Sequence, residues 1–358
     1  MIQKKYILPI LLVVQIVVMK ILGFFPEFVE TYYSNGIYVW ISAFSRTVLG
    51  SIPFSVGDVL YFVLIAYLIR KISKSRKTFK SEWKDNILSV LSFFSVFYFF
   101  FHLLWATNYH RETLSDKMSI ETDYSDEDLL IFTKKLILKT NALHLQITKN
   151  DSLKVAFPYS QDEVFEMNLN GYDNLAQQYP FFTYKHPSIK KSIISLPLTY
   201  MGFAGYLNPF TNEAQVNDKL PMYSFPLTTN HEMAHQIGYA SESEANFIGF
   251  LASIHNDDLH IQYSGYAFAL RYCLGNWEIR NEKILDELLP TVNPGIRKNF
   301  KETRDFWAQY ETFIEEGFKI FYDKFLKFNQ QKDGLDSYSK FVNLIVNYEK
   351  SSGKILNP

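Results

Sequence analysis

The chain is poor in cysteine, with Cys273 alone among 358 residues. A single cysteine excludes a disulfide within the chain and every zinc site built on several thiolates. It does not fix the cellular compartment, because a cytosolic protein and an extracytoplasmic domain without disulfides both fit it.

The chain also lacks an excess of charge of either sign. Lys and Arg together number 36, Asp and Glu number 37, and the net charge is -1. Nucleic-acid binding needs a basic face, and the second half of the sequence offers none, so we expect no nucleic-acid partner. The sequence has no internal repeats and no low-complexity segments. A length of 358 residues suits a protein with two structural parts.

Apolar and aromatic residues are abundant instead, and many of them lie in the first third. Apolar runs occupy residues 6–25, 52–69 and 87–106. About 20 apolar residues cross a bilayer, so we predict three transmembrane helices and the lipid bilayer as a partner. The first run exceeds the apolar core of a signal peptide and no small-residue cleavage site follows it.

Basic residues predict the orientation of these helices. Residues 70–84 are rich in Lys and Arg, the N-terminus has Lys4 and Lys5, and the segment 26–51 has only Arg46. Basic loops remain in the cytoplasm, so the chain after about residue 108 should lie outside. We predict a multi-pass protein of a bacterial cell membrane, with residues 1–107 as the membrane region and 108–358 as a periplasmic domain.

The predicted outer domain is mainly helical. Capping boxes at Ser125 and Ser160 start two of its helices. Residues 190–198 are β-like, and the Gly- and Pro-containing residues 200–217 fit short strands and turns. We therefore expect an α-rich α+β domain with a small sheet before residue 224. Its edge could bind an extended peptide or could be an ordinary hairpin packed on helices.

The most informative stretch is His231-Glu232-Met-Ala-His235. In a helix that begins near residues 224–226, positions i and i+4 share a face, so both imidazoles can bind one Zn²⁺ ion. Histidine is scarce in this chain, with eight residues in all, yet two have this spacing. Gly238 then ends the helix or allows a close turn.

Two acids are candidates for the third metal ligand in a second helix, predicted over residues 242–254. Glu242 and Asn246 are four residues apart and share a face, so Glu242 could bind zinc while Asn246 orients a histidine. Glu244 points elsewhere and remains the alternative ligand. Glu232 would act as the catalytic base on a zinc-bound water. The oxyanion-stabilising residue is open among Tyr239, Tyr266, Tyr272, Tyr322 and Tyr338.

The stretch from His231 to Asn246 resembles gluzincin-like metallopeptidases, whose second helix carries a similar E-x-x-A-[DN] pattern. The whole layout is similar to an uncharacterised bacterial family of membrane-anchored H-E-x-x-H proteins, a domain of unknown function. Besides the apolar first third and the H-E-x-x-H stretch, that similarity rests on residues 108–111, 202–217 and 322–330.

The resemblance implies a zincin-like fold and a membrane-anchored zinc metallopeptidase that cleaves an unidentified peptide or protein. A non-catalytic zinc-containing receptor or scaffold is the alternative, although a structural zinc site normally has four ligands. A transporter component is a third hypothesis, which the lack of an inverted repeat disfavours.

Overall fold

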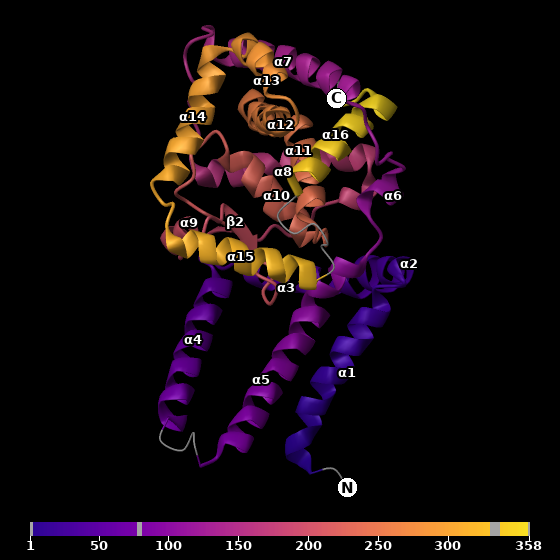
Figure 1. Cartoon of the computed structure of the whole chain (residues 1–358), viewed down its shortest axis with the longest axis vertical. Helices are drawn as coiled ribbons and strands as arrows, with labels where there is room; N and C mark the ends of the chain where they lie inside the picture. The colour runs from indigo at the N-terminus through magenta and orange to yellow at the C-terminus, as the bar shows by residue number, and fades with distance from the viewer. Residues whose placement is uncertain (1–2, 77–80, 330–336, 357–358) are drawn as a thin grey trace.

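A computed structural model describes residues 3–76, 81–329 and 337–356. These residues form a mainly helical body, from one end of which α1, α4 and α5 project (Figure 1). The first third contains η1 Lys4–Tyr6, α1 Ile7–Leu22, α2 Pro26–Phe28, the π-helix η2 Val29–Ile37, α3 Tyr38–Gly50, α4 Val56–Ser75, α5 Trp83–Leu104 and the 3₁₀ helix η3 Ala106–His110.

The prediction of three membrane-spanning helices is wrong. Among the described residues, two helices are long and apolar enough to cross a membrane, Lys4–Leu22 and Trp83–Leu104. Only 6% of the first and 17% of the second is buried inside the protein, so neither is a core helix.

Helix α4 does not qualify as a span because charged residues occur near both of its ends. Asp58 lies in its first turn, and Arg70, Lys71 and Lys74 lie in its last turns. The Asp58 carboxylate is buried in the body, where it accepts hydrogen bonds from Ser192 Oγ (2.9 Å) and the Ile193 amide (2.7 Å). The predicted span 52–69 therefore begins inside the body.

The body is built around α11 Glu242–Ile254, whose residues from Ser243 onward are all buried. The main core joins its apolar side chains to those of α7, α8, α12 and α16. The other helices of the body are α6 Leu114–Met118, α7 Asp126–Thr148, α8 Gln161–Gln178, η4 Pro180–Phe182, α9 Ser195–Tyr200, α10 Phe225–Gln236, α12 Leu259–Arg280, α13 Glu282–Leu288, η5 Leu289–Thr291, α14 Pro294–Ala308, α15 Phe313–Phe328 and α16 Ser337–Ser352.

The capping boxes at Ser125 and Ser160 are both present, at the starts of α7 and α8. The β content is smaller than predicted, because the β-like residues 190–198 give one short strand and then helix α9. The sheet has strands β1 Ile189–Lys191, β2 Gly205–Leu207 and β3 Ala214–Val216, in the order β1-β3-β2. Strand β3 pairs parallel with β1 and antiparallel with β2, so β2 has a free edge. The predicted α+β class is thus corrected to a mainly helical fold with a three-stranded sheet.

Candidate metal centre

The H-E-x-x-H stretch lies on α10, and the acids that follow it open α11. Pro226 occupies the first turn of α10, where its missing N–H leaves no helical bond unmade. Helix α10 ends at Gln236, and Gly238 has φ +91°, which a residue with a Cβ rarely adopts. The chain reverses there, and Glu242 begins the next helix, as the sequence predicted.

Both imidazoles are held through Nδ1. His231 Nδ1 lies 2.8 Å from Asn246 Oδ1, and His235 Nδ1 lies 2.6 Å from the carbonyl oxygen of Tyr239. A carbonyl-type oxygen accepts a hydrogen bond from Nδ1–H, which leaves the lone pair on Nε2 for another partner. Asn246 thus occupies the orienting position that its i+4 spacing from Glu242 indicated.

Glu242 is the carboxylate that meets the two imidazoles. Its Oε2 lies 3.2 Å from His231 Nε2, and its Oε1 lies 3.9 Å from His235 Nε2. Two ligand atoms about 2.1 Å from a tetrahedral zinc ion are about 3.4 Å apart, so these separations bracket the value that zinc needs. Glu244 instead accepts a hydrogen bond from the Leu114 amide (2.6 Å) on the opposite side of the helix.

Glu232 lies beside this cluster. One ligand atom from each of His231, Glu232 and His235 lies within 4.8 Å of the others. Glu232 is buried, and its Oε2 has no hydrogen-bond partner among the described residues. A Cβ at Gly205 of strand β2 would lie 2.6 Å from Glu232 Oε1, so only glycine admits the carboxylate there.

The ionisable groups of the cluster have shifted pKa values. Burial would lower the pKa of His231, but its hydrogen bond to Glu242 and the charges of Glu232 and Glu242 outweigh burial and raise it, so a metal would have to displace a proton there. Burial would raise the pKa of Glu242, but hydrogen bonding to His231 and the charge of His235 outweigh it and lower that pKa to about 2. Burial lowers the pKa of His235 to about 4 and raises the pKa of Glu232 to about 8. An anionic Glu242 and a neutral His235 are the forms in which these residues bind metals. The donors of His231, His235 and Glu242 therefore fit a Zn²⁺ ion.

A tyrosine from far along the chain completes the cluster. The Tyr322 hydroxyl of α15 donates a hydrogen bond to Glu242 Oε1 (2.6 Å). Tyr239 instead packs its ring against the Arg111 guanidinium, and Tyr266 donates to the carbonyl of Ile355. The side chain of Tyr338 lies outside those described. Among 24 tyrosines, no local pattern in the sequence singles out Tyr322.

The C-terminal end of α10 is capped by residues from the first third of the chain. Trp105 Nε1 donates to the carbonyl of His235 (3.2 Å), the Tyr38 hydroxyl to that of Gln236 (3.0 Å), and Arg111 Nη1 to that of Gly238 (2.9 Å). The last carbonyls of a helix have no i+4 amide to accept from, and these donors add to the bonds that the Gly238 amide makes to His235 and Ser42 Oγ makes to Gln236. We call these three bonds the α10 cap.

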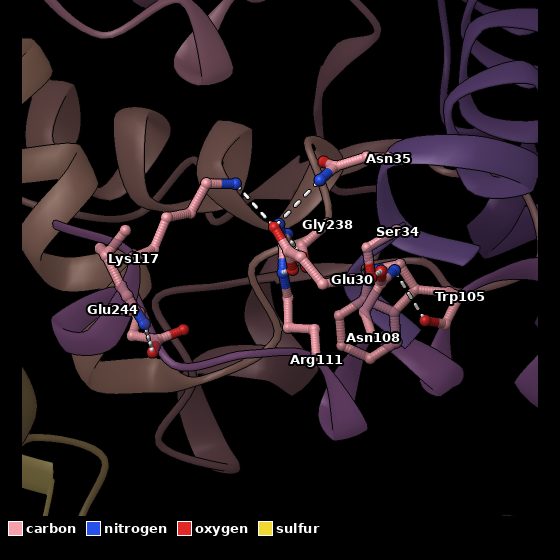
Figure 2. A network of polar contacts seen from close by, with 10 residues as sticks. Glu30, Ser34, Asn35, Trp105, Asn108, Arg111, Lys117, Gly238 and Glu244 are labelled. Carbon is pink, nitrogen blue, oxygen red and sulfur yellow. Dashed lines mark hydrogen bonds and ion pairs between the residues drawn. The ribbon is translucent and has the colours of Figure 1, made fainter. Parts of the chain in front are cut away.

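A buried ion pair holds the α10 cap in place (Figure 2). The Arg111 guanidinium donates from Nε and Nη2 to both oxygens of Glu30, each at 2.8 Å, and Lys117 Nζ lies 2.6 Å from Glu30 Oε1. Burial would raise the pKa of Glu30, but these two cations lower it to about 2. Glu244, which accepts the bond from the Leu114 amide, lies close to this network in Figure 2. Glu244 therefore belongs to a structural region, not to the histidine cluster.

A cavity of about 750 Å³ opens from the histidine cluster. Glu232 and Glu242 line one end of it, and strand β2 and α15 form two of its walls. Most of the remaining wall is apolar or aromatic, and it includes Tyr61 of α4 and Phe97 and Phe101 of α5. Substrate-sized space thus reaches from the histidine cluster to the projecting helices.

A family model described as "Protein of unknown function (DUF3810)" matches residues 33–346. The match spans both predicted parts of the chain and confirms that the resemblance pointed to a family of unknown function. It names no activity, and nothing in it indicates a zinc metallopeptidase family. No curated protein and no solved structure matches the chain.

Proposed function

The chain belongs to the DUF3810 family, whose function is unknown, and we propose from the geometry of its site that it is a membrane-anchored zinc metallopeptidase. The observation that carries this proposal is the convergence of two Nε2 atoms on the Glu242 carboxylate, beside the unpaired and buried Glu232. Three protein ligands are the number that catalytic zinc sites use, whereas structural zinc sites have four. The receptor or scaffold hypothesis has no comparable support.

Each residue has a defined task in peptide hydrolysis. His231, His235 and Glu242 would hold the Zn²⁺ ion, and Asn246 and the Tyr239 carbonyl would orient the two imidazoles. A bound Zn²⁺ supplies a Lewis acid that polarises the scissile carbonyl and lowers the pKa of the attacking water. Glu232 takes the proton from that water and passes it to the leaving amine. The Tyr322 hydroxyl fixes the Glu242 carboxylate.

Strand β2 supplies a place for the substrate backbone. Its free edge belongs to residues that line the cavity, and Gly205 lies directly against Glu232. An extended peptide that paired with β2 would bring its carbonyl groups next to the catalytic carboxylate. The sheet is too short for a long recognition segment, so a few substrate residues would be bound in this way.

We place the body outside the cytoplasm, on the periplasmic side of a bacterial cell membrane. The candidate spans begin at the same end, where Lys5 Nζ pairs with Asp85 Oδ1 at 2.9 Å, and both run toward the body (Figure 1). Lys4 of η1 and Lys84 in the first turn of α5 lie at the starts of these two spans, and basic residues of this kind favour the cytoplasmic side. A reporter fused to Pro358 that was active only in the cytoplasm would contradict this orientation.

The decisive variant is Glu232→Gln in the full chain, purified in detergent with zinc. We expect zinc content to be unchanged and cleavage of a quenched-fluorescence peptide library to fall about 10²–10⁴-fold, the usual contribution of a general base. Glu278→Gln makes the same chemical change at an exposed position on α12 and should leave the rate unchanged. Equal rates for wild type and Glu232→Gln would disprove the proposed mechanism.

A further inference from the structure

Helix α15 carries an exposed apolar face at the end of the body from which α1, α4 and α5 project. Phe313, Ile320 and Phe328 are 83%, 59% and 63% exposed. Figure 1 shows α15 at the same height along the long axis as α3, just above the projecting helices. Its opposite face contributes Tyr322 and Phe325 to the cavity. Helix α15 therefore contributes one face to the cavity and leaves its other face exposed.

Helix α3 repeats this pattern at the same height. Trp40 and Phe44 are 80% and 71% exposed. Amphipathic helices with exposed aromatic residues lie in the interface of a bilayer, and aromatic side chains gather at the level of the lipid headgroups. The faces of α3 and α15 therefore mark the bilayer surface, which the end of the candidate span at Leu104 also marks.

The cavity extends below this level. Phe97 lines it and lies seven residues before Leu104, which corresponds to roughly 10 Å along a helix. Its ring contacts that of Phe210 in the body, with centroids 5.1 Å apart, and the Phe101 ring lies 6.0 Å from that of Phe325. These pairs build an aromatic wall from the bilayer level up to the histidine cluster.

We propose that the substrate is a lipid-anchored peptide, with its acyl chain in the cavity between α5 and α15 and its scissile bond at Glu232. This inference rests on the proposed peptidase activity and names its substrate class. An acyl chain gains about 0.8 kcal/mol for each methylene that it buries, so an apolar cavity open at the bilayer level recognises it. A substrate without such a chain would leave this wall in contact with water.

The shape of an acyl chain suits this cavity. A peptide helix with its side chains is about 10–12 Å wide, and an acyl chain is much thinner. An acyl chain can therefore lie along the aromatic wall and leave space for an extended peptide beside strand β2.

The test is photo-crosslinking with a palmitoylated decapeptide that carries a diazirine in its acyl chain. The full chain, with zinc, is placed in lipid nanodiscs and the adducts are mapped by mass spectrometry. We expect adducts on cavity residues such as Phe101, Phe210 and Phe325. Adducts confined to outward-facing residues of the spans, such as Phe94 or Val13, would overturn the proposal because they would report only on lipid contact.

Competition identifies which part of the probe is recognised. An excess of unlabelled palmitoylated peptide should reduce the adducts at least about tenfold, whereas the same peptide without the acyl chain should not, because it lacks the buried methylenes. Complete competition by palmitate alone would mean that the cavity binds free lipid and would overturn the substrate assignment. This comparison uses only the wild-type chain.

A matched pair of variants tests whether the aromatic wall of the cavity binds the acyl chain. Phe210→Asp places a carboxylate in the cavity and should reduce crosslinking at least about tenfold, because a buried charge without a partner is costly. Phe313→Asp makes the same change on the outer face of α15, outside the cavity lining, and should retain crosslinking. Equal crosslinking yields from the two variants would contradict the proposal. The zinc content of each variant shows whether it has folded.

The outcome separates this inference from the peptidase proposal. Wild type that crosslinks the acyl chain in the cavity but cleaves no peptide would refute the peptidase and retain the cavity as a site for an acylated peptide. Equal cleavage of acylated and non-acylated peptides would retain the peptidase and refute the substrate class. Glu232→Gln should crosslink as well as wild type, because Glu232 does not contact the acyl chain.

Discussion

Glu242 and Glu244 lie two residues apart in the first turn of α11, yet they belong to different regions. Glu242 faces the cavity, where it meets two imidazoles and a tyrosine hydroxyl. Glu244 faces the buried network of Glu30, Arg111 and Lys117, where it accepts a backbone hydrogen bond from Leu114.

The two regions differ in how completely their polar groups are paired. Glu30 has partners on both oxygens, whereas Glu232, on the cavity side, has a buried oxygen without any described partner. An unpaired buried acceptor costs about 1–3 kcal/mol, and this cost is accepted where an external group will bind. The complete pairing of Glu30 fits a structural role, and the unpaired oxygen of Glu232 fits a role toward a bound group.

Substitution of each glutamate by alanine should give the largest difference in zinc affinity between the two regions. Glu242→Ala removes the proposed third metal ligand, so we expect zinc affinity to fall more than about 100-fold, beyond the loss from outer contacts. Glu244→Ala should keep zinc affinity within about threefold and lower the stability of the body, because the Leu114 amide loses its acceptor. Competition with a chromophoric chelator measures the zinc affinity of each variant. Similar losses of zinc affinity in the two variants would contradict the assignment of Glu242 and Glu244 to different regions.

Replacement of Arg111, a buried cation of the ion-pair network, should mainly lower the free energy of unfolding. Arg111→Met leaves Glu30 buried with Lys117 as its remaining cation, and we expect the free energy of unfolding to fall by about 3–5 kcal/mol. Arg280→Met breaks the exposed pair with Asp126 and should cost less than about 1 kcal/mol. Denaturant unfolding in detergent, followed by tryptophan fluorescence, measures both. A cost for Arg111→Met no larger than that for Arg280→Met would show that the network is not structural.

Variants of Asn246 test how much zinc affinity depends on the hydrogen bond that orients His231. Asn246→Ala removes the acceptor for His231 Nδ1, and zinc affinity should fall about 10–100-fold while the fold is retained. Asn246→Asp keeps an acceptor and adds charge, so it should bind zinc at least as tightly as wild type. An alanine variant with unchanged affinity would remove Asn246 from the site.

The α10 cap should give the smallest effect. Trp105→Phe keeps an aromatic ring but loses the donor to the His235 carbonyl, and should lower the free energy of unfolding by about 1 kcal/mol. Trp83→Phe, at a half-exposed position on α5, serves as the control and should cost nothing measurable. A larger effect of Trp83→Phe would argue against the cap.

Local patterns in the sequence predicted much of the histidine cluster. The i, i+4 spacing places His231 and His235 on one face, and Gly238 and Glu242 gave the end of one helix and the start of the next. The same spacing identified Asn246 as a partner for a histidine. These features depend on residues within one or two turns, where helix geometry alone fixes which side chains meet.

Features that depend on distant contacts could not be predicted. Asp58 appeared to lie in a membrane span because its partners Ser192 and Ile193 are more than 130 residues away. Tyr38 and Tyr322 reach the corner between α10 and α11 from opposite ends of the sequence. Residues 195–200 form helix α9 despite a β-like composition, because packing in the body overrides a weak local preference.

Through the α10 cap, the segment that contains Tyr38 and Trp105 stabilises the helix that carries His235. Proteolytic shedding, which frees the outer domains of many anchored proteins, would here remove Tyr38 and Trp105 together with the spans. The released fragment would carry His235 on a helix whose last carbonyls had lost two of their donors. Detachment from the membrane would thus also weaken the helix that carries His235, so the proposed zinc site would be more stable in the anchored protein than in the released fragment.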